Sequence, residues 1–219
     1  MLDAVFDRGA GWWDGFYADR DREVPFFRPA PDESLVAWHH EGLLAAGGRA
    51  LDLGCGPGRN AVWLAQQGYQ VDALDVSPVA LDWGRERAAA AGAEVRFVQA
   101  DVLGWRPEAR YDLVYDSGCF HHLPPHRRLS YRALLDRALA PGAAFGLACF
   151  ARGAMGSETP DAQLYREGSL AGGLAYDDED LRAVFDGLTE VQLRRMRPMP
   201  PESPLFGEAF LWAALFRRP

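Results

Sequence analysis

The sequence predicts one α/β domain with a doubly wound sheet of seven strands, mostly parallel and closed by an antiparallel C-terminal strand. The chain has 219 residues, enough for one sizeable core and too few for two full-sized domains. Apolar strands alternate with amphipathic helices over residues 50–150, and a crossover between parallel strands must pass over the sheet. The last two strands, about 189–196 and 208–216, are joined by a proline-rich loop too short for a crossover helix. They are therefore expected to form an antiparallel hairpin.

Each element of the alternating region has a recognisable boundary. A strand from Ala50 to Leu53 runs into a glycine-rich turn, and the helix over 60–67 is closed by Gly68. After the strand 69–75, Ser77 and Pro78 supply the N-cap and first-turn proline of a helix that reaches Gly92. Further strands are expected at 94–101, 111–116 and 143–150, with a helix between Pro124 and Ala140 that is stopped by Pro141-Gly142.

Three segments lie outside this alternation. Residues 1–48 carry an aromatic stretch, interpreted as a lid or cap, and then a helix expected from Pro31 to Ala46, whereas residues 49–219 form the main domain. Residues 151–175 are rich in glycine and short of periodicity, which indicates a mobile surface loop. The acidic cluster 177–180 is expected to cap a helix whose apolar positions include Leu181 and Phe185.

The composition favours a small-molecule substrate. A formal charge of −8, from 31 acidic and 23 basic residues, gives no electrostatic footprint for nucleic acid. Lysine does not occur, which excludes a Schiff base on the chain. Three scattered cysteines indicate a reducing compartment, and the absence of a long apolar segment argues against a membrane. We therefore expect a cytoplasmic monomer or homodimer.

Three alternating glycines, Gly54, Gly56 and Gly58, directly follow the first strand. Only glycine permits the close backbone approach and the positive φ that such a turn needs. The next strand ends on Asp75, 21 residues beyond Gly54, about the separation at which a carboxylate reaches ribose hydroxyls across a βαβ unit. A third strand ends on Asp101. The pattern predicts a crevice that binds a nucleoside cofactor.

Over residues 36–216 the sequence resembles the class I S-adenosylmethionine-dependent methyltransferases, which have a Rossmann-like sheet with an antiparallel last hairpin. The family's first motif, an acid followed by three alternating glycines, corresponds to Asp52 and the glycines above. The resemblance implies that Asp52 holds the methionine end of S-adenosyl-L-methionine and Asp75 the ribose hydroxyls. It also implies that Asp101 and the Val102 amide read the adenine edge. The residues expected at this cofactor, or at its product S-adenosyl-L-homocysteine, are Asp52, Gly54, Cys55, Gly56, Gly58, Asn60, Asp75, Val76, Asp101, Val102, Asp116, Ser117 and Trp13.

The implied reaction is in-line transfer of a methyl group to a small acceptor. The candidate catalytic residues are His121, His122 and Asp116, because a hydroxyl acceptor would need one of them to remove its proton. A soft nucleophile such as a thiol, selenol or metalloid needs little or no base. The alternative for the histidines is that one packs and the other is solvated.

The N-terminal stretch Trp12-Trp13-Asp14-Gly15-Phe16-Tyr17, followed by Pro25-Phe26-Phe27, resembles the aromatic opening of the thiopurine and tellurite-resistance methyltransferases. In that subgroup an N-terminal segment folds over the cofactor, so the resemblance favours a sulfur or other chalcogen acceptor. As a lid, the segment would exclude water and lay aromatic faces on a sulfonium. The alternative is that these rings cover one edge of the core.

Other interpretations remain open. A dinucleotide fingerprint matches Gly56, Gly58 and Ala61 literally, although starting it at Gly54 puts Arg59 where the third glycine or alanine belongs, so an NAD-dependent oxidoreductase is one alternative. A non-catalytic S-adenosylmethionine-binding protein is another. No metal site is expected, because His39, His40 and His126 lack ligand spacing. The thiols of Cys55 and Cys119 are interpreted as packing groups, and the cluster Arg194, Arg195 and Arg197 as a solvated edge.

Overall fold

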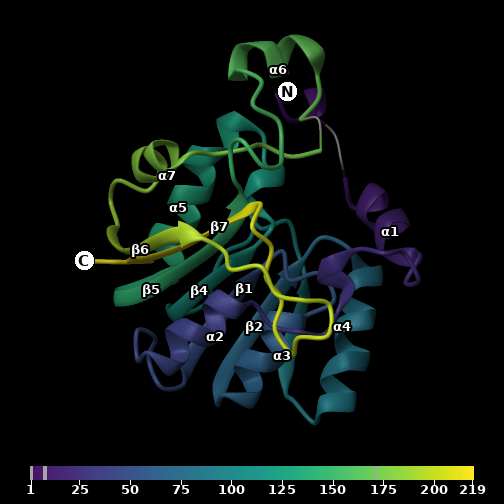
Figure 1. Ribbon diagram of the computed structural model, residues 1–219, viewed down its shortest axis with the longest axis vertical. Coiled ribbons are helices and arrows are strands. Elements are labelled where there is room, and N and C mark those ends of the chain that lie inside the picture. The colour runs from purple at the N-terminus through teal and green to yellow at the C-terminus, as the bar shows by residue number, and fades with distance from the viewer. Residues whose placement is uncertain (1, 7–8, 171) are drawn as a thin grey trace.

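The computed structural model describes residues 2–6, 9–170 and 172–219 and shows a seven-stranded sheet with helices on both faces (Figure 1). The strand order is β3-β2-β1-β4-β5-β7-β6. The strands are β1 (Gly48–Leu53), β2 (Tyr69–Asp75), β3 (Val95–Gln99), β4 (Tyr111–Ser117), β5 (Leu139–Phe150), β6 (Thr189–Arg195) and β7 (Leu211–Arg217). The α-helices are α1 (Ala10–Ala18), α2 (Glu33–His40), α3 (Arg59–Gln66), α4 (Pro78–Ala91), α5 (Arg128–Ala138), α6 (Asp161–Glu167) and α7 (Asp178–Val184). Short 3₁₀ turns are η1 (Asp3–Val5), η2 (Pro25–Phe27), η3 (Phe120–His122) and η4 (Pro125–Arg127).

The centre of the sheet is β1, which lies between β2 and β4 and runs parallel to both. The chain adds β2 and β3 on one side of β1 and then crosses to the other side to form β4. Leu53, near the end of β1, pairs with Leu74 on one side and Asp116 on the other. Such a reversal of strand order opens a crevice at the carboxyl ends of the strands, which is where ligands bind in open α/β sheets.

Two apolar cores fill the space between the sheet and its helices (Figure 1). On one face Tyr131 of α5 and Phe185, which directly follows α7, pack against Phe145 of β5. On the other face α2 and α3 bury Trp38 and Leu64 completely. Fully burying an aromatic or leucine side chain contributes about 1.5–3 kcal/mol, so packing on both faces stabilises the sheet.

The predicted fold class is confirmed, and several boundaries agree closely. β2 spans Tyr69–Asp75 as predicted. The hydroxyl oxygen of Ser77 caps α4 by accepting from the Ala80 amide at 3.2 Å, and Gly92 ends that helix with φ +62°. The last two strands are antiparallel, also as predicted.

Three expectations need correction. The helix predicted from Pro31 to Ala46 is only α2, because Asp32 makes an extended bridge with Phe206 before it and Gly42 adopts φ +70° after it. Pro141-Gly142 does not stop a helix but lies within β5, beside a register irregularity in its pairing with β4. The segment 151–175, expected to lack regular structure, contains α6 and buries Leu164. Within the described residues we find no helix both long and apolar enough to cross a membrane.

Candidate active site

The glycine loop joins β1 to α3 at the crevice and has the backbone conformation that its sequence predicts. Gly54, Gly56 and Gly58 have φ angles of +62°, +51° and +73°. The Cys55 amide donates to the Leu74 carbonyl at 2.8 Å, which ties the loop to the end of β2. A Cβ atom at Gly54 would lie 2.5 Å from Cβ of Cys119, so the loops after β1 and β4 approach to backbone contact.

Asp75 ends β2 with its carboxylate turned toward this loop. Its Oδ2 accepts from the Gly56 amide at 2.8 Å and its Oδ1 accepts from the Ser77 amide at 2.9 Å. Burial raises the pKa of Asp75, and these two amides oppose that shift. An ionised carboxylate offers about four lone-pair sites, so each oxygen keeps capacity for a hydroxyl donor.

Asp52 lies on β1, the strand that leads into the glycine loop. Its side chain is buried, and Oδ2 has no hydrogen-bond partner among the residues that the structure describes. Burial raises its pKa well above the usual range, whereas the charge of Arg59 acts in the opposite direction. A buried acceptor without a donor is costly, typically about 1–3 kcal/mol. An ammonium group brought by a ligand would satisfy it.

The residues predicted at the adenine edge lie at the end of β3. The Ala100 amide donates to the Asp75 carbonyl at 3.0 Å, which brings the chain beyond β3 beside Asp75. Asp101 is exposed, its Oδ1 accepts from the Leu103 amide at 2.9 Å, and Val102 is buried. The structure thus brings Asp101, Val102 and Asp75 to one strand edge. Val76 follows Asp75 there, and its carbonyl accepts from Gln99 at 3.4 Å.

Asn60, predicted to contact the cofactor, instead uses its side-chain amide for hydrogen bonds within the protein. Its Oδ1 accepts from the Asp32 amide at 2.9 Å, and its Nδ2 donates to Asp32 Oδ2 at 3.2 Å. The neighbouring Arg59 pairs with Asp32 Oδ1 at 2.5 Å and donates to Ser117 Oγ at 2.8 Å. The sequence alone indicates no role for Arg59 or Asp32, because a charged residue at the start of a helix gives no local signal of burial.

Asp116, predicted both at the cofactor and as a catalytic base, is completely buried at the end of β4. Its oxygens accept from the amides of Cys119 at 2.9 Å and Phe120 at 3.0 Å and from the Tyr131 hydroxyl at 2.7 Å. Burial raises its pKa to about 6 against the effect of these bonds. The carboxylate thereby fixes the loop that carries the two histidines.

His121 and His122 touch each other in η3. Nδ1 of His121 accepts from the Phe150 amide at 3.2 Å, so its proton resides on Nε2, which lies 3.1 Å from Nε2 of His122. The His121 ring stacks on Phe150 with centroids 3.7 Å apart. Burial, and secondarily the charge of His122, lowers the pKa of His121 well below its usual value. His121 is therefore a neutral packed ring, whereas His122 is partly exposed.

The aromatic N-terminal helix α1 lies against this site rather than on a remote edge of the core. Asp14 accepts from Ser77 Oγ at 2.5 Å, beside Asp75. The ring of Trp13 meets His122 edge to face at 5.0 Å between centroids. A Cβ atom at Gly56 would lie 2.9 Å from the Tyr17 hydroxyl. The helix α1 thus covers the glycine loop and reaches the histidine loop.

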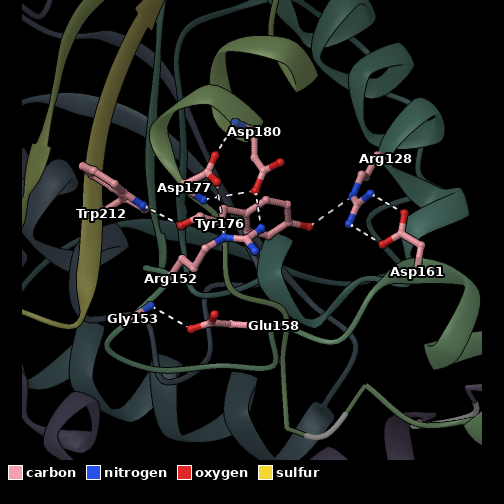
Figure 2. A network of polar contacts seen from close by, with 9 residues as sticks. All are labelled: Arg128, Arg152, Gly153, Glu158, Asp161, Tyr176, Asp177, Asp180 and Trp212. Atoms are coloured by element: carbon pink, nitrogen blue, oxygen red, sulfur yellow. Dashed lines mark hydrogen bonds and ion pairs between the residues drawn. The ribbon is translucent and has the colours of Figure 1, made fainter.

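The segment 151–176 approaches the histidines from the other side. The Leu174 amide donates to the His121 carbonyl at 2.7 Å, and a Cβ atom at Gly173 would lie 3.2 Å from His122 Nδ1. The flanks of the segment are tied by ion pairs (Figure 2). Arg152 pairs with Asp177 and Asp180, and Arg128 pairs with Asp161 at 2.8 Å. The segment that was expected to be a mobile loop is therefore held beside the site by ion pairs.

The other residues singled out in the sequence make contacts within the protein. Burial raises the pKa of the Cys55 and Cys119 thiols well above the usual range, in keeping with packing roles. Arg194, expected on a solvated edge, instead pairs with buried Glu33 through bonds of 2.6 and 3.0 Å. His126 contacts the Tyr165 hydroxyl and Asp3, each at 2.9 Å. Over the described ranges, no group of three or more His, Cys, Asp or Glu side chains could hold a metal ion.

Comparison with known proteins agrees with this architecture. Residues 50–142 match the family of methyltransferase domains. A 2-heptyl-1-hydroxyquinolin-4(1H)-one methyltransferase of Mycobacteroides abscessus is 34% identical over 109 residues, 49% of this chain and 48% of that protein. A structure solved for the conversion of a disulfide bond into a thioacetal group during echinomycin biosynthesis gives a TM-score of 0.72 at 28% identity, covering 95% of this chain and 92% of that one. TehB from Haemophilus influenzae shares the fold, with a TM-score of 0.62 at 14% identity over 85% and 62% of the two chains.

Over residues 50–142 the chain is therefore similar to methyltransferase domains. The chain has the Rossmann-like fold of the class I S-adenosylmethionine-dependent methyltransferases, as its sequence resemblance predicted. The matched region spans about half the length of the quinolone methyltransferase.

Proposed function

We propose that the protein transfers the methyl group of S-adenosyl-L-methionine to a small-molecule acceptor. The observation that carries this proposal is the pair of buried carboxylates, Asp52 and Asp75, at the ends of β1 and β2, on either side of a glycine loop. Carboxylates suit an ammonium group and ribose hydroxyls, whereas they would repel the diphosphate of a dinucleotide. The same loop lies beneath the aromatic helix α1.

Each part of this cofactor has residues that would bind it. The open Oδ2 of Asp52 would take the ammonium of the methionine end, and Asp75 would take the ribose hydroxyls. Asp101 and the Val102 amide would face the adenine, and Ser117 and Trp13 would lie toward the sulfonium. Cys55, Gly54, Gly56 and Gly58 would contribute backbone, and Val76 would flank the ribose. We assign Asn60 and Asp116 to holding the walls of the site rather than to ligand contact, because their polar atoms bond within the protein.

The cofactor supplies a methyl group already activated on a sulfonium, so the chain has mainly to orient the reactants. Orientation alone can supply about 7–11 kcal/mol of a barrier. Trp13 and Tyr17 of α1 would exclude water from above, and the segment that includes Gly173 would close the acceptor side. As in the sequence interpretation, residues 1–48 comprise an aromatic cap followed by a helix, and residues 49–219 form the methyltransferase domain.

We infer that the favoured acceptor atom is sulfur or another chalcogen. His121 is neutral and packed, and its Nε2 proton points at Nε2 of His122, so the nitrogen that would accept a proton is already engaged. A thiolate needs no base. The relative concerned with a disulfide and a thioacetal supports sulfur chemistry. A hydroxyl acceptor is the alternative, supported by the hydroxyquinolone named for the other relative, and it would require His122 as base.

A turnover assay separates this proposal from its competitors. The purified protein is incubated with S-adenosyl-L-methionine and panels of thiols, phenols, amines and halides, and released S-adenosyl-L-homocysteine is measured. Turnover with thiols is the expected result. Binding without turnover on any panel would indicate a non-catalytic binding protein, and reduction or oxidation of NAD with a hydroxy acid would indicate an oxidoreductase.

We also propose a substrate class, an oligomeric state and a cellular location for the protein. A small molecule is the expected substrate, and the formal charge of −8 supports the absence of a nucleic-acid partner. We propose a monomer or homodimer in the cytoplasm, supported by cysteines that lie unpaired within the described structure.

A further inference from the structure

Arg59, the first residue of α3, is a buried cation that joins three separate segments at the crevice. Its side chain is 7% exposed. Nη1 lies 2.5 Å from Asp32 Oδ1 and donates to the Ala30 carbonyl at 3.1 Å, while Nη2 donates to Ser117 Oγ at 2.8 Å. The guanidinium also lies 4.2 Å from the ring centroid of Phe206. One side chain therefore connects residues 30–32, the end of β4 and the loop before β7.

Asp32 is the anion that holds Arg59 in this position. It is completely buried, and its Oδ2 also accepts from the Tyr115 hydroxyl at 2.6 Å and from Asn60 at 3.2 Å. Residues 30–34 are seated by backbone bonds as well, because Phe206 donates to the Pro31 carbonyl and accepts from the Glu33 amide. Residues 30–34 form a short segment that we call the strap.

Asp52 is a second buried acid in this cluster. It pairs in register with Tyr115, whose hydroxyl donates to Asp32, and Asp32 forms the ion pair with the charge of Arg59. That charge opposes the effect of burial on Asp52, yet Asp52 Oδ2 is left without a hydrogen bond among the described residues. The guanidinium instead donates to the Ala30 carbonyl and to Ser117 Oγ and forms an ion pair with Asp32. A buried charge that loses its partner is strongly destabilised, so it pairs with another group of opposite charge where one is available.

We propose that Arg59 is a positioning residue which couples seating of the strap to cofactor binding at Asp52. With Asp32 in place, Arg59 is held toward the strap and Asp52 Oδ2 stays open for the ammonium group of the ligand. When the strap carboxylate is missing, Arg59 turns to Asp52 and occupies the oxygen that the ligand needs. This inference rests on the proposed function, since it assigns Asp52 to the amino-acid end of the cofactor.

Two ligands that differ only at that end provide the test. S-adenosyl-L-homocysteine carries the ammonium group, whereas 5′-methylthioadenosine keeps the nucleoside and lacks the amino acid. Calorimetry on Asp32→Asn is expected to show about a tenfold or greater loss for the first ligand and little change for the second. The matched control is Glu33→Gln, which breaks another buried strap ion pair, to Arg194, away from the crevice. It should leave the ratio of the two affinities unchanged.

The double variant Asp32→Asn with Arg59→Met keeps the test informative if the single variant folds poorly, because it leaves no unpaired charge at this pair. It should regain most of the preference for S-adenosyl-L-homocysteine, since the competing guanidinium is gone. Equal loss for both ligands in Asp32→Asn, an altered ratio in Glu33→Gln, or no recovery in the double variant would each overturn the inference. If the unaltered protein binds neither ligand, the proposed function itself fails, and that result is seen before any variant is made.

Discussion

The phenol of Tyr17 packs on the backbone of Gly56, so closely that a side-chain carbon at position 56 would lie 2.9 Å from the phenolic oxygen. This contact places α1 directly over the glycine loop. Gly56 has φ +51°, and its amide donates to Asp75. Gly56 therefore forms part of the turn, donates to the carboxylate that we propose for the ribose, and contacts the covering helix.

Replacing Gly56 by alanine should displace α1 from the loop. The matched control is Gly68→Ala, because Gly68 also has a positive φ, of +88°, but an added Cβ would meet nothing within 4 Å. Both substitutions cost about 1–2 kcal/mol of backbone strain, measurable by urea denaturation. Only Gly56→Ala should also change tryptophan fluorescence and expose α1 to protease. Equal behaviour of the two variants would contradict the lid contact.

Asp75→Asn should weaken binding of S-adenosyl-L-homocysteine by about tenfold or more, because it replaces an acceptor facing the ribose by a donor. The control is Asp72→Asn on the same strand. Asp72 is also buried, but it bonds the Tyr111 hydroxyl at 2.6 Å and pairs with Arg49 at 3.3 Å, away from the glycine loop. Calorimetry should find an unchanged affinity in the control. Equal weakening in both variants would point to a general loss of stability.

Asp116 should give the folding free energy a pH dependence of definite sign. Its pKa is about 6 in the folded protein, above the ordinary 3.8, so the folded state binds the proton more tightly than the unfolded chain. Its contribution to stability is complete below about pH 4 and is lost as the pH rises through 6. An asparagine does not titrate.

The destabilisation caused by Asp116→Asn should therefore be largest near pH 4 and smaller by up to about 3 kcal/mol at pH 7. Denaturant titrations of both proteins at the two pH values measure this difference, in which the other titrating groups cancel. A constant difference between pH 4 and 7 would show that burial does not raise this pKa.

His122→Ala should leave methyl transfer to thiols largely intact, because a thiolate reaches the methyl group without a base. Initial rates at saturating cofactor, with thiol and phenol acceptors side by side, check this expectation. The affinity for S-adenosyl-L-homocysteine should change little in the same variant. A loss of about a hundredfold or more with thiols would assign His122 a proton-transfer role and favour an acceptor that must be deprotonated.

The sequence predicted the strands, helix caps and glycine turns whose conformation is set by neighbouring residues. Hydrophobic periodicity, capping residues and glycines were sufficient to predict β2, α4 with its Ser77 cap, and the glycine loop. Asp75 was found because it ends an apolar strand, and Asp52 because an acid followed by three alternating glycines resembles the first motif of the methyltransferases.

Contacts between distant segments were the part that the sequence did not reveal. The burial of Arg59 depends on Asp32, 27 positions earlier, and on Ser117, 58 positions later. Asn60 looked available for a ligand because its partner, Asp32, could not be known in advance. The helix α6 is short, lies in a glycine-rich segment, and is held by tertiary contacts such as that of buried Leu164 rather than by strong periodicity.

The central claim is that the ends of β1 and β2 hold a sulfur nucleoside carrying an amino-acid group. Isothermal titration of the unaltered protein with S-adenosyl-L-homocysteine and, separately, with NAD tests it most directly. We expect saturable binding of S-adenosyl-L-homocysteine that is weakened in Asp75→Asn, and no binding of NAD. Binding of NAD alone, or of neither compound, would contradict it.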